Sequence, residues 1–240
     1  MYRQVTSPAI VLARTNFNEV DRIVTFLGPK GQFSAMVKGV RKVKSKLAGG
    51  IELFSVSQIT YLDTKSDLKV VVQSSLLNHF GDIAGNLERM LFAYDCMKFL
   101  KRITPEETDD ENYYLSLKNL LEALNDSKID LNLIKLWWLV RVLELSGHGL
   151  ELYKDAKLKQ LLENQDYSFV VGSARLIPQD GGVVSSDAIK VLRLMQEGRP
   201  PKVLAKLNSS LKLRTTGKSV DSLSKKVYRE LEAASKELLS

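Results

Sequence analysis

Val20-Asp21-Arg22-Ile23-Val24-Thr25-Phe26-Leu27-Gly28-Pro29-Lys30-Gly31-Gln32-Phe33-Ser34-Ala35-Met36-Val37 is the stretch that decides the fold of the first third of the chain. The Gly-Pro-Lys-Gly sequence at residues 28–31 is a strong turn signal between two apolar runs. Residues 20–27 and residues 32–37 therefore predict two strands joined by a short connection.

Three further strands are predicted around this pair. Residues 9–13 form a short apolar run, and residues 51–59 place several apolar side chains at alternating positions. A polar connection at residues 63–67 leads into a last apolar run at residues 68–77. Five short strands in about 70 residues predict a small barrel, and the OB-fold is the five-stranded barrel of this kind.

The apolar period changes from two residues to nearly four after Gly81. Helices are predicted from about residue 87 to before Pro105, and then at residues 113–124, 131–146, 187–196, 200–207 and 219–240. Asp130 is the expected N-cap of the third helix. The fold class is therefore α+β: an OB-fold at residues 1–80, then a mainly helical domain at residues 81–240 with an irregular or β-like insert near residues 166–186.

Positive charge is concentrated in the first third of the chain. Residues 1–80 hold 11 Lys and Arg against 5 Asp and Glu, which accounts for most of the formal net charge of +7. Residues 38–50 contain no acidic residue and carry five cations, Lys38, Arg41, Lys42, Lys44 and Lys46. If the segment is extended, its four lysines share one side. Such a row of cations suits a phosphate backbone, although a solvated basic loop is the alternative.

Composition indicates a protein of a reducing compartment. The single cysteine, Cys96, lies in a helical pattern and is expected to be a buried apolar residue. The N-terminus has no signal-peptide core, and the most apolar stretch, residues 131–145, contains Lys135, Arg141 and Glu144. The sequence predicts a cytoplasmic protein with no membrane contact.

Catalytic and metal-binding motifs are missing their parts. Gly217-Lys218-Ser219 has the ending of a phosphate-binding loop, but Lys212 stands where the first glycine belongs. His79 and His148 fall in different predicted domains, and no cysteine is near either. The sequence therefore predicts no enzyme, no cofactor and no metal site.

The order of these motifs resembles the RecO family of bacterial recombination mediators. The likeness is carried by residues 9–12 (AIVL), 18–25 (NEVDRIVT), Gly31, 38–41 (KGVR), 44–47 (KSKL) and Gly50, and more weakly by 145–150 (LSGHGL). The resemblance implies an N-terminal OB-fold and a helical C-terminal domain. It also implies a cytoplasmic, nucleoid-associated DNA repair protein that binds single- and double-stranded DNA, anneals complementary strands and helps to load recombinase.

The resemblance implies particular sites and partners. The five cations of residues 38–46 would contact DNA phosphates, and the helical domain would bind RecR and the C-terminal tail of single-stranded DNA-binding protein. Stacking aromatics would come from Phe17 or Phe33, but aromatics in a small barrel are more often core, so neither is included in the site. Trp137 and Arg141 are the candidates for a partner groove, with ordinary helix packing as the alternative.

One departure from the family pattern concerns zinc. Many RecO proteins hold a structural zinc with two CxxC pairs after the helical region, and residues 152–186 here contain no cysteine. Either this lineage holds the segment by packing, or the C-terminal likeness is false. Two other functions stay open: a protein-interaction adaptor whose basic segment docks on an acidic surface, and a hydrolase or nuclease for which no residues can be named.

Overall fold

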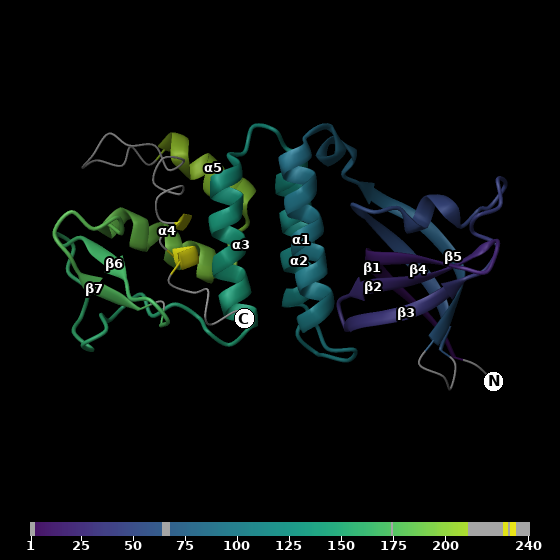
Figure 1. Ribbon diagram of the computed structural model, residues 1–240, viewed down its shortest axis with the longest axis horizontal. Coiled ribbons are helices and arrows are strands. Elements are labelled where there is room, and N and C mark those ends of the chain that lie inside the picture. The colour runs from purple at the N-terminus through teal and green to yellow at the C-terminus, as the bar shows by residue number, and fades with distance from the viewer. Residues whose placement is uncertain (1–2, 64–67, 174, 211–227, 230, 234–240) are drawn as a thin grey trace. The chain divides into compact units, whose positions relative to one another are not determined.

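The computed structural model describes residues 3–63, 68–173, 175–210, 228–229 and 231–233 of the protein (Figure 1). Contacts group the chain into two compact units, the N-terminal unit of residues 1–125 and the C-terminal unit of residues 126–240. Within the described ranges, no helix is both long and apolar enough to cross a membrane.

Five strands form a closed barrel in the N-terminal unit (Figure 1). They are β1 (Arg3–Phe17), β2 (Asp21–Gly28), β3 (Gly31–Val37), β4 (Ser55–Asp63) and β5 (Leu68–His79). The order around the barrel is β1-β2-β3-β5-β4, and β3 and β5 are the parallel neighbours. The first half of β1 pairs with β4 and its second half with β2, so this long strand closes the barrel. The OB-fold prediction is confirmed.

The fourth strand begins later than predicted. Residues Ala48–Ile51 form a short 3-10 helix, η1, and β4 starts only at Ser55. Ile51 is fully buried among the barrel's core side chains, and Phe54 turns the chain with a φ of 55°. The apolar residues at 51 and 53 therefore close and line one end of the barrel rather than alternate along a strand.

Two helices belong to the same compact unit as the barrel: α1 (Leu87–Ile103) and α2 (Asn112–Asn125). The connection between them is hydrogen-bonded to the β2–β3 turn, because the Gln32 N–H donates to Pro105 O at 3.0 Å and the Thr108 N–H donates to Lys30 O at 3.1 Å. Gly31 has a φ of 108°, and a Cβ there would lie 2.7 Å from Pro105 O. The contacts thus place α1 and α2 in one unit with the barrel, whereas the sequence pattern assigns both helices to the helical domain.

The C-terminal unit is built around α3 (Leu131–Leu145), with α4 (Ser186–Gln196) and α5 (Pro201–Ser210) packed against it. Asp130 caps α3 as predicted, accepting the N–H groups of Asn132 and Leu133 at 2.8 and 3.1 Å. Core side chains lie on all sides of α3, ten of whose fifteen residues are buried. The helix is therefore buried around most of its circumference.

A small two-stranded sheet occupies the predicted β-like insert. Its strands are β6 (Tyr167–Phe169) and β7 (Leu176–Pro178), and an isolated bridge joins Tyr167 to Val184. The predicted helix from Ser219 onward and the Gly217-Lys218-Ser219 sequence lie outside the described residues, apart from short helical stretches at 228–229 and 231–233.

Candidate nucleic-acid interface

The basic segment is an anchored loop between β3 and η1, which we call the basic loop (residues 38–47). Val40 is 4% exposed and is part of the barrel core, and Leu47 packs against that core at the other end of the loop. The Gly39 N–H donates to Asp21 Oδ1 at 2.7 Å, and the Arg41 N–H donates to Val20 O at 2.9 Å. The loop is thus fixed to the β1–β2 corner.

The basic loop is folded into turns and is not extended. The Lys42 N–H donates to Gly39 O at 3.1 Å, and the Ser45 N–H donates to Lys42 O at 2.9 Å. Gly39 adopts a φ of 64°, which favours glycine and reverses the chain there. The arrangement of four lysines on one side of a strand therefore does not form. The cations follow a curved path instead.

All five predicted DNA-contacting side chains are exposed: Lys38, Arg41, Lys42, Lys44 and Lys46. The Arg41 guanidinium donates to Asn18 O at 3.2 Å. Within the part of the chain that the structure describes, no carboxylate pairs with any of the five. Their positive charge is available to an anion from outside.

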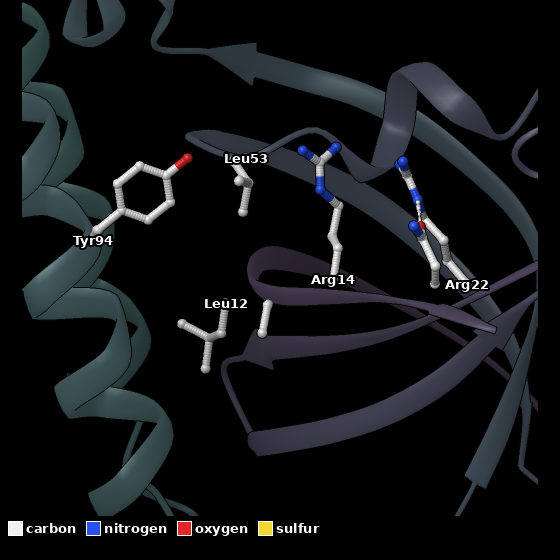
Figure 2. Close-up of a pocket in the computed structure, with 7 residues that line it drawn as sticks. Leu12, Arg14, Arg22, Leu53 and Tyr94 are labelled. Carbon is white, nitrogen blue, oxygen red and sulfur yellow. Dashed lines mark hydrogen bonds between the residues drawn. The ribbon is translucent and has the colours of Figure 1, made fainter.

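Two further arginines of the N-terminal unit line a pocket beside the barrel. It has a volume of about 420 Å³ and is lined by Leu12, Ala13, Arg14, Asn16, Arg22, Leu53 and Tyr94 (Figure 2). Sequence reasoning missed Arg14 and Arg22. The signal was a cation at the end of each of two adjacent strands, but only the strand register shows that both side chains share one face.

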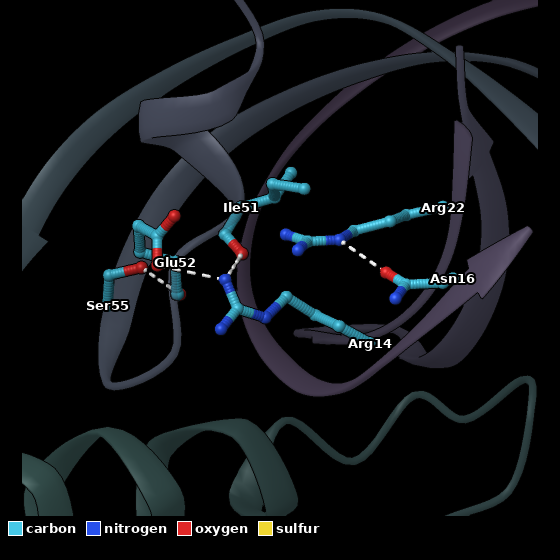
Figure 3. A network of polar contacts seen from close by, with 6 residues as sticks. All are labelled: Arg14, Asn16, Arg22, Ile51, Glu52 and Ser55. Atoms are coloured by element: carbon cyan, nitrogen blue, oxygen red, sulfur yellow. Dashed lines mark hydrogen bonds and ion pairs between the residues drawn. The ribbon is translucent and has the colours of Figure 1, made fainter. Parts of the chain in front are cut away.

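Hydrogen bonds fix the two guanidiniums in place (Figure 3). Arg14 Nη1 donates to Glu52 Oε2 at 2.9 Å and to Ile51 O at 3.4 Å. Arg22 Nε donates to Asn16 Oδ1 at 3.1 Å. With two cations and one carboxylate, this network carries a net positive charge.

The two aromatic candidates for base stacking, Phe17 and Phe33, differ in their exposure. Phe33 stacks on Phe26 with ring centroids 5.2 Å apart and lies 4.6 Å from the ring of Tyr61. Phe33 therefore packs against the barrel core, which agrees with its omission from the site. Phe17 is 38% exposed at the end of β1.

The candidate partner residues of the C-terminal unit are buried. Trp137 is 1% exposed, and its indole N–H donates to Arg199 O at 2.8 Å. Arg141 is 7% exposed and donates to Gln196 O at 3.3 Å. The Trp137 ring thus faces no open groove, and helix packing, the alternative, accounts for both side chains.

Within the described ranges, no group of three or more His, Cys, Asp or Glu side chains is arranged to hold a metal ion. Cys96 is buried, as expected, and burial raises the pKa of its thiol well above the ordinary value.

Comparison with known proteins identifies relatives for most of the chain. The family model for the N terminus of recombination protein O matches residues 1–80, and the model for its C terminus matches residues 84–217. The DNA repair protein RecO of Roseiflexus sp. (strain RS-1) is 32% identical over 227 residues, covering 91% of this chain and 78% of the relative. That of Dehalococcoides mccartyi (strain ATCC BAA-2266 / KCTC 15142 / 195) is 31% identical over 202 residues, covering 81% and 79%. These relatives are named for DNA repair and not for a reaction. The chain belongs to the RecO family.

Proposed function

We propose that this protein is a non-catalytic recombination mediator that binds DNA through its basic loop, anneals complementary strands and assists recombinase loading. The observation that carries the proposal is the exposure of five cations on one loop whose ends are fixed to the barrel, with no carboxylate partner among the described residues. Family membership supports the repair context.

The mechanism would be electrostatic. Each strand repels its complement through its phosphates, and cations held on a fixed loop neutralise part of that charge while releasing counterions. Lysines that contact phosphates carry no base information, so the bases stay free to pair and no sequence preference is expected. RecR and the C-terminal tail of single-stranded DNA-binding protein are the proposed partners for recombinase loading, on family grounds.

The test compares two triple variants in a salt series. The basic-loop variant has alanine in place of Lys42, Lys44 and Lys46. The control variant has alanine in place of three exposed lysines of the C-terminal unit, Lys154, Lys157 and Lys159. Fluorescence anisotropy of a labelled single strand gives the slope of log affinity against log salt. At roughly 0.7 per contact, the basic-loop variant should lower that slope by about 2, and the control variant should not.

A measurement of the annealing rate distinguishes a recombination mediator from a protein-interaction adaptor. Two complementary strands with a donor and an acceptor dye report pairing by energy transfer, and the wild type should accelerate it more than the basic-loop variant. Equal slopes for the two variants would contradict the proposed interface. DNA binding without accelerated annealing would contradict the mediator mechanism and favour an adaptor whose basic loop meets an acidic surface.

A further inference from the structure

The pocket of the N-terminal unit has two chemically different sides (Figure 2). Leu12, Leu53 and the ring of Tyr94 supply apolar surface, and Arg14 and Arg22 supply cations. The Tyr94 ring is 41% exposed and meets Phe54 edge-on, with centroids 5.1 Å apart and an interplanar angle of 66°. Phe54 therefore holds the ring while leaving part of it open to a ligand.

The two arginines are on the inner face of the barrel sheet, at its end. Arg14 pairs with Val24 and Arg22 pairs with Val37 in the strand register, and both valines are fully buried core residues. Cross-strand partners share a face, so both arginine stems emerge from the core side. Cations are rarely placed on such a face unless they are paired.

Only part of this charge is used by the fold. Glu52 pairs with Arg14. Arg22 is held through Nε alone, and in the described part of the chain its two Nη atoms meet no acceptor. A guanidinium fork fixed at Nε, with its Nη groups unused, is suited to a phosphate or another planar anion.

We infer that the pocket takes one unstacked nucleotide of a bound single strand, with its base against Tyr94 and the two leucines and its phosphate on Arg22. This inference rests on the proposed function, and it adds to that function a preference for single-stranded over duplex DNA. The cavity, about 420 Å³, falls within the size range of small-ligand sites. Exposed aromatic rings add base stacking to backbone charge in proteins that bind single strands.

Arg22 of the pocket and the start of the basic loop lie at the same end of the β2–β3 pair. Val37, opposite Arg22 in the register, is the residue directly before Lys38, and the Gly39 N–H is bonded to Asp21, the residue before Arg22. A strand whose phosphates lie along the basic loop can therefore place its next phosphate at Arg22. A duplex cannot offer a base to Tyr94, because its bases are paired and stacked.

The experiment measures affinity for three probes of equal length: a single strand, the same strand in duplex, and a single strand carrying abasic sites. Tyr94→Leu should weaken binding of the intact single strand by about 5- to 150-fold, because stacking on an aromatic ring contributes about 1–3 kcal/mol per base. Its affinities for the duplex and the abasic strand should stay at the wild-type value. Tyr94→Phe should behave as the wild type.

Arg22→Gln is the second variant, since it leaves the Tyr94 ring and its contact with Phe54 intact. It should weaken single-strand binding and lower the salt slope by about 0.7, because one phosphate contact is lost. Lys30→Gln, at an exposed cation in the β2–β3 turn beyond the opposite end of β2, is the matched control and should lower neither the affinity nor the salt slope.

The outcomes distinguish this inference from the proposed function. If Tyr94→Leu and Arg22→Gln both keep the wild-type ratio of single-strand to duplex affinity, the pocket takes no nucleotide, even where the basic-loop variant loses DNA. If the wild type binds no DNA at all, both ideas fail. A loss in Tyr94→Leu that is confined to the intact single strand, together with weaker single-strand binding in Arg22→Gln, supports the pocket.

Discussion

The basic loop and the segment at residues 151–184 are both irregular, and they use their polar side chains in opposite ways. In the basic loop, Val40 and Leu47 hold the ends on the barrel and the charged side chains between them are exposed. In segment 151–184, the side chains of Glu151, Asp155 and Tyr167 accept hydrogen bonds from the segment's own backbone. A charged residue that the fold does not use is the better candidate for binding.

Segment 151–184 shows how polar groups hold an irregular chain together. Asp155 is 4% exposed, and its Oδ1 accepts the N–H groups of Lys157 and Lys159 at 2.8 and 2.9 Å. The Tyr167 hydroxyl accepts the Leu162 N–H at 2.7 Å. The C-terminal family model covers this segment, so the C-terminal likeness holds although the chain has no cysteine there. Hydrogen bonds and packing hold the segment without a thiolate cluster.

Tyr167→Ala, in segment 151–184, is expected to have the largest effect on stability. The ring is 2% exposed, so its loss should lower the free energy of unfolding of the C-terminal unit by about 3–5 kcal/mol, as for other buried aromatic rings. The Lys42, Lys44, Lys46 triple variant should change the stability of either unit by no more than about 0.5 kcal/mol.

The chain carries a reporter for each unit, which makes this comparison measurable. Both tryptophans, Trp137 and Trp138, lie in the C-terminal unit, and the single cysteine, Cys96, is buried in the N-terminal unit. In a urea titration, Tyr167→Ala should shift the tryptophan fluorescence transition and leave the urea dependence of thiol labelling in place. Val171→Ala, at a side chain that is 70% exposed, is the control. An unshifted fluorescence transition would contradict the packing role of Tyr167.

Two glycines give the next largest effect: Gly182 in segment 151–184, and Gly50 in η1 directly after the basic loop. A Cβ at Gly182 would lie 2.6 Å from the carbonyl carbon of Tyr167, and a Cβ at Gly50 would lie 3.0 Å from the carbonyl carbon of Ser74. Overpacking of this kind costs about 1–3 kcal/mol, so Gly182→Ala should destabilise the C-terminal unit and Gly50→Ala the N-terminal unit. Gly49→Ala, which meets no atom within 4 Å, should be neutral in both assays.

The barrel was predictable because its signals are local. Alternating apolar residues and a glycine-proline turn define strands without any knowledge of their partners. The same reasoning failed at Ile51, where an apolar residue that fits the alternation belongs to a 3-10 helix and closes the barrel end. At Trp137 the burial of α3 favours helix packing, which the sequence left open beside a partner groove.

The candidate site was predictable only in part, because a local sequence pattern does not show which side chains the fold brings together. A run of cations such as Lys42, Lys44 and Lys46 is visible in sequence, but its path in turns is set by the contacts at the loop's two ends. Arg14 and Arg22 share a face because of the β1–β2 register, and Tyr94 joins them from α1. Such a juxtaposition depends on tertiary packing, which no local pattern contains.

Asp155→Asn is expected to have a smaller effect than the glycine variants. The amide keeps an acceptor oxygen for Lys157 and Lys159 but loses the charge, and bonds to charged groups are stronger than neutral ones by about 1 kcal/mol. The C-terminal unit should lose about that much stability in the tryptophan fluorescence assay. Asp180→Asn, at an exposed carboxylate, is the control. Equal midpoints for both variants would show that the Asp155 charge has no structural role.

The smallest effect is a pH dependence at Glu151, at the start of the same segment. Its carboxylate accepts the N–H groups of Tyr153 and Lys154 at 2.8 and 3.1 Å, and these bonds lower its pKa from the ordinary value. A carboxyl whose pKa is lower in the folded state stabilises the fold above its unfolded pKa, about 4.3, and loses that contribution as the pH falls through the folded value. Glu151→Gln should therefore be slightly less stable than the wild type at neutral pH, and the difference should shrink on acidification. Unfolding midpoints from pH 7 down to pH 3, read by tryptophan fluorescence, give that difference directly. A gap that stays constant or widens would mean that the charge of Glu151 does not act on these two N–H groups.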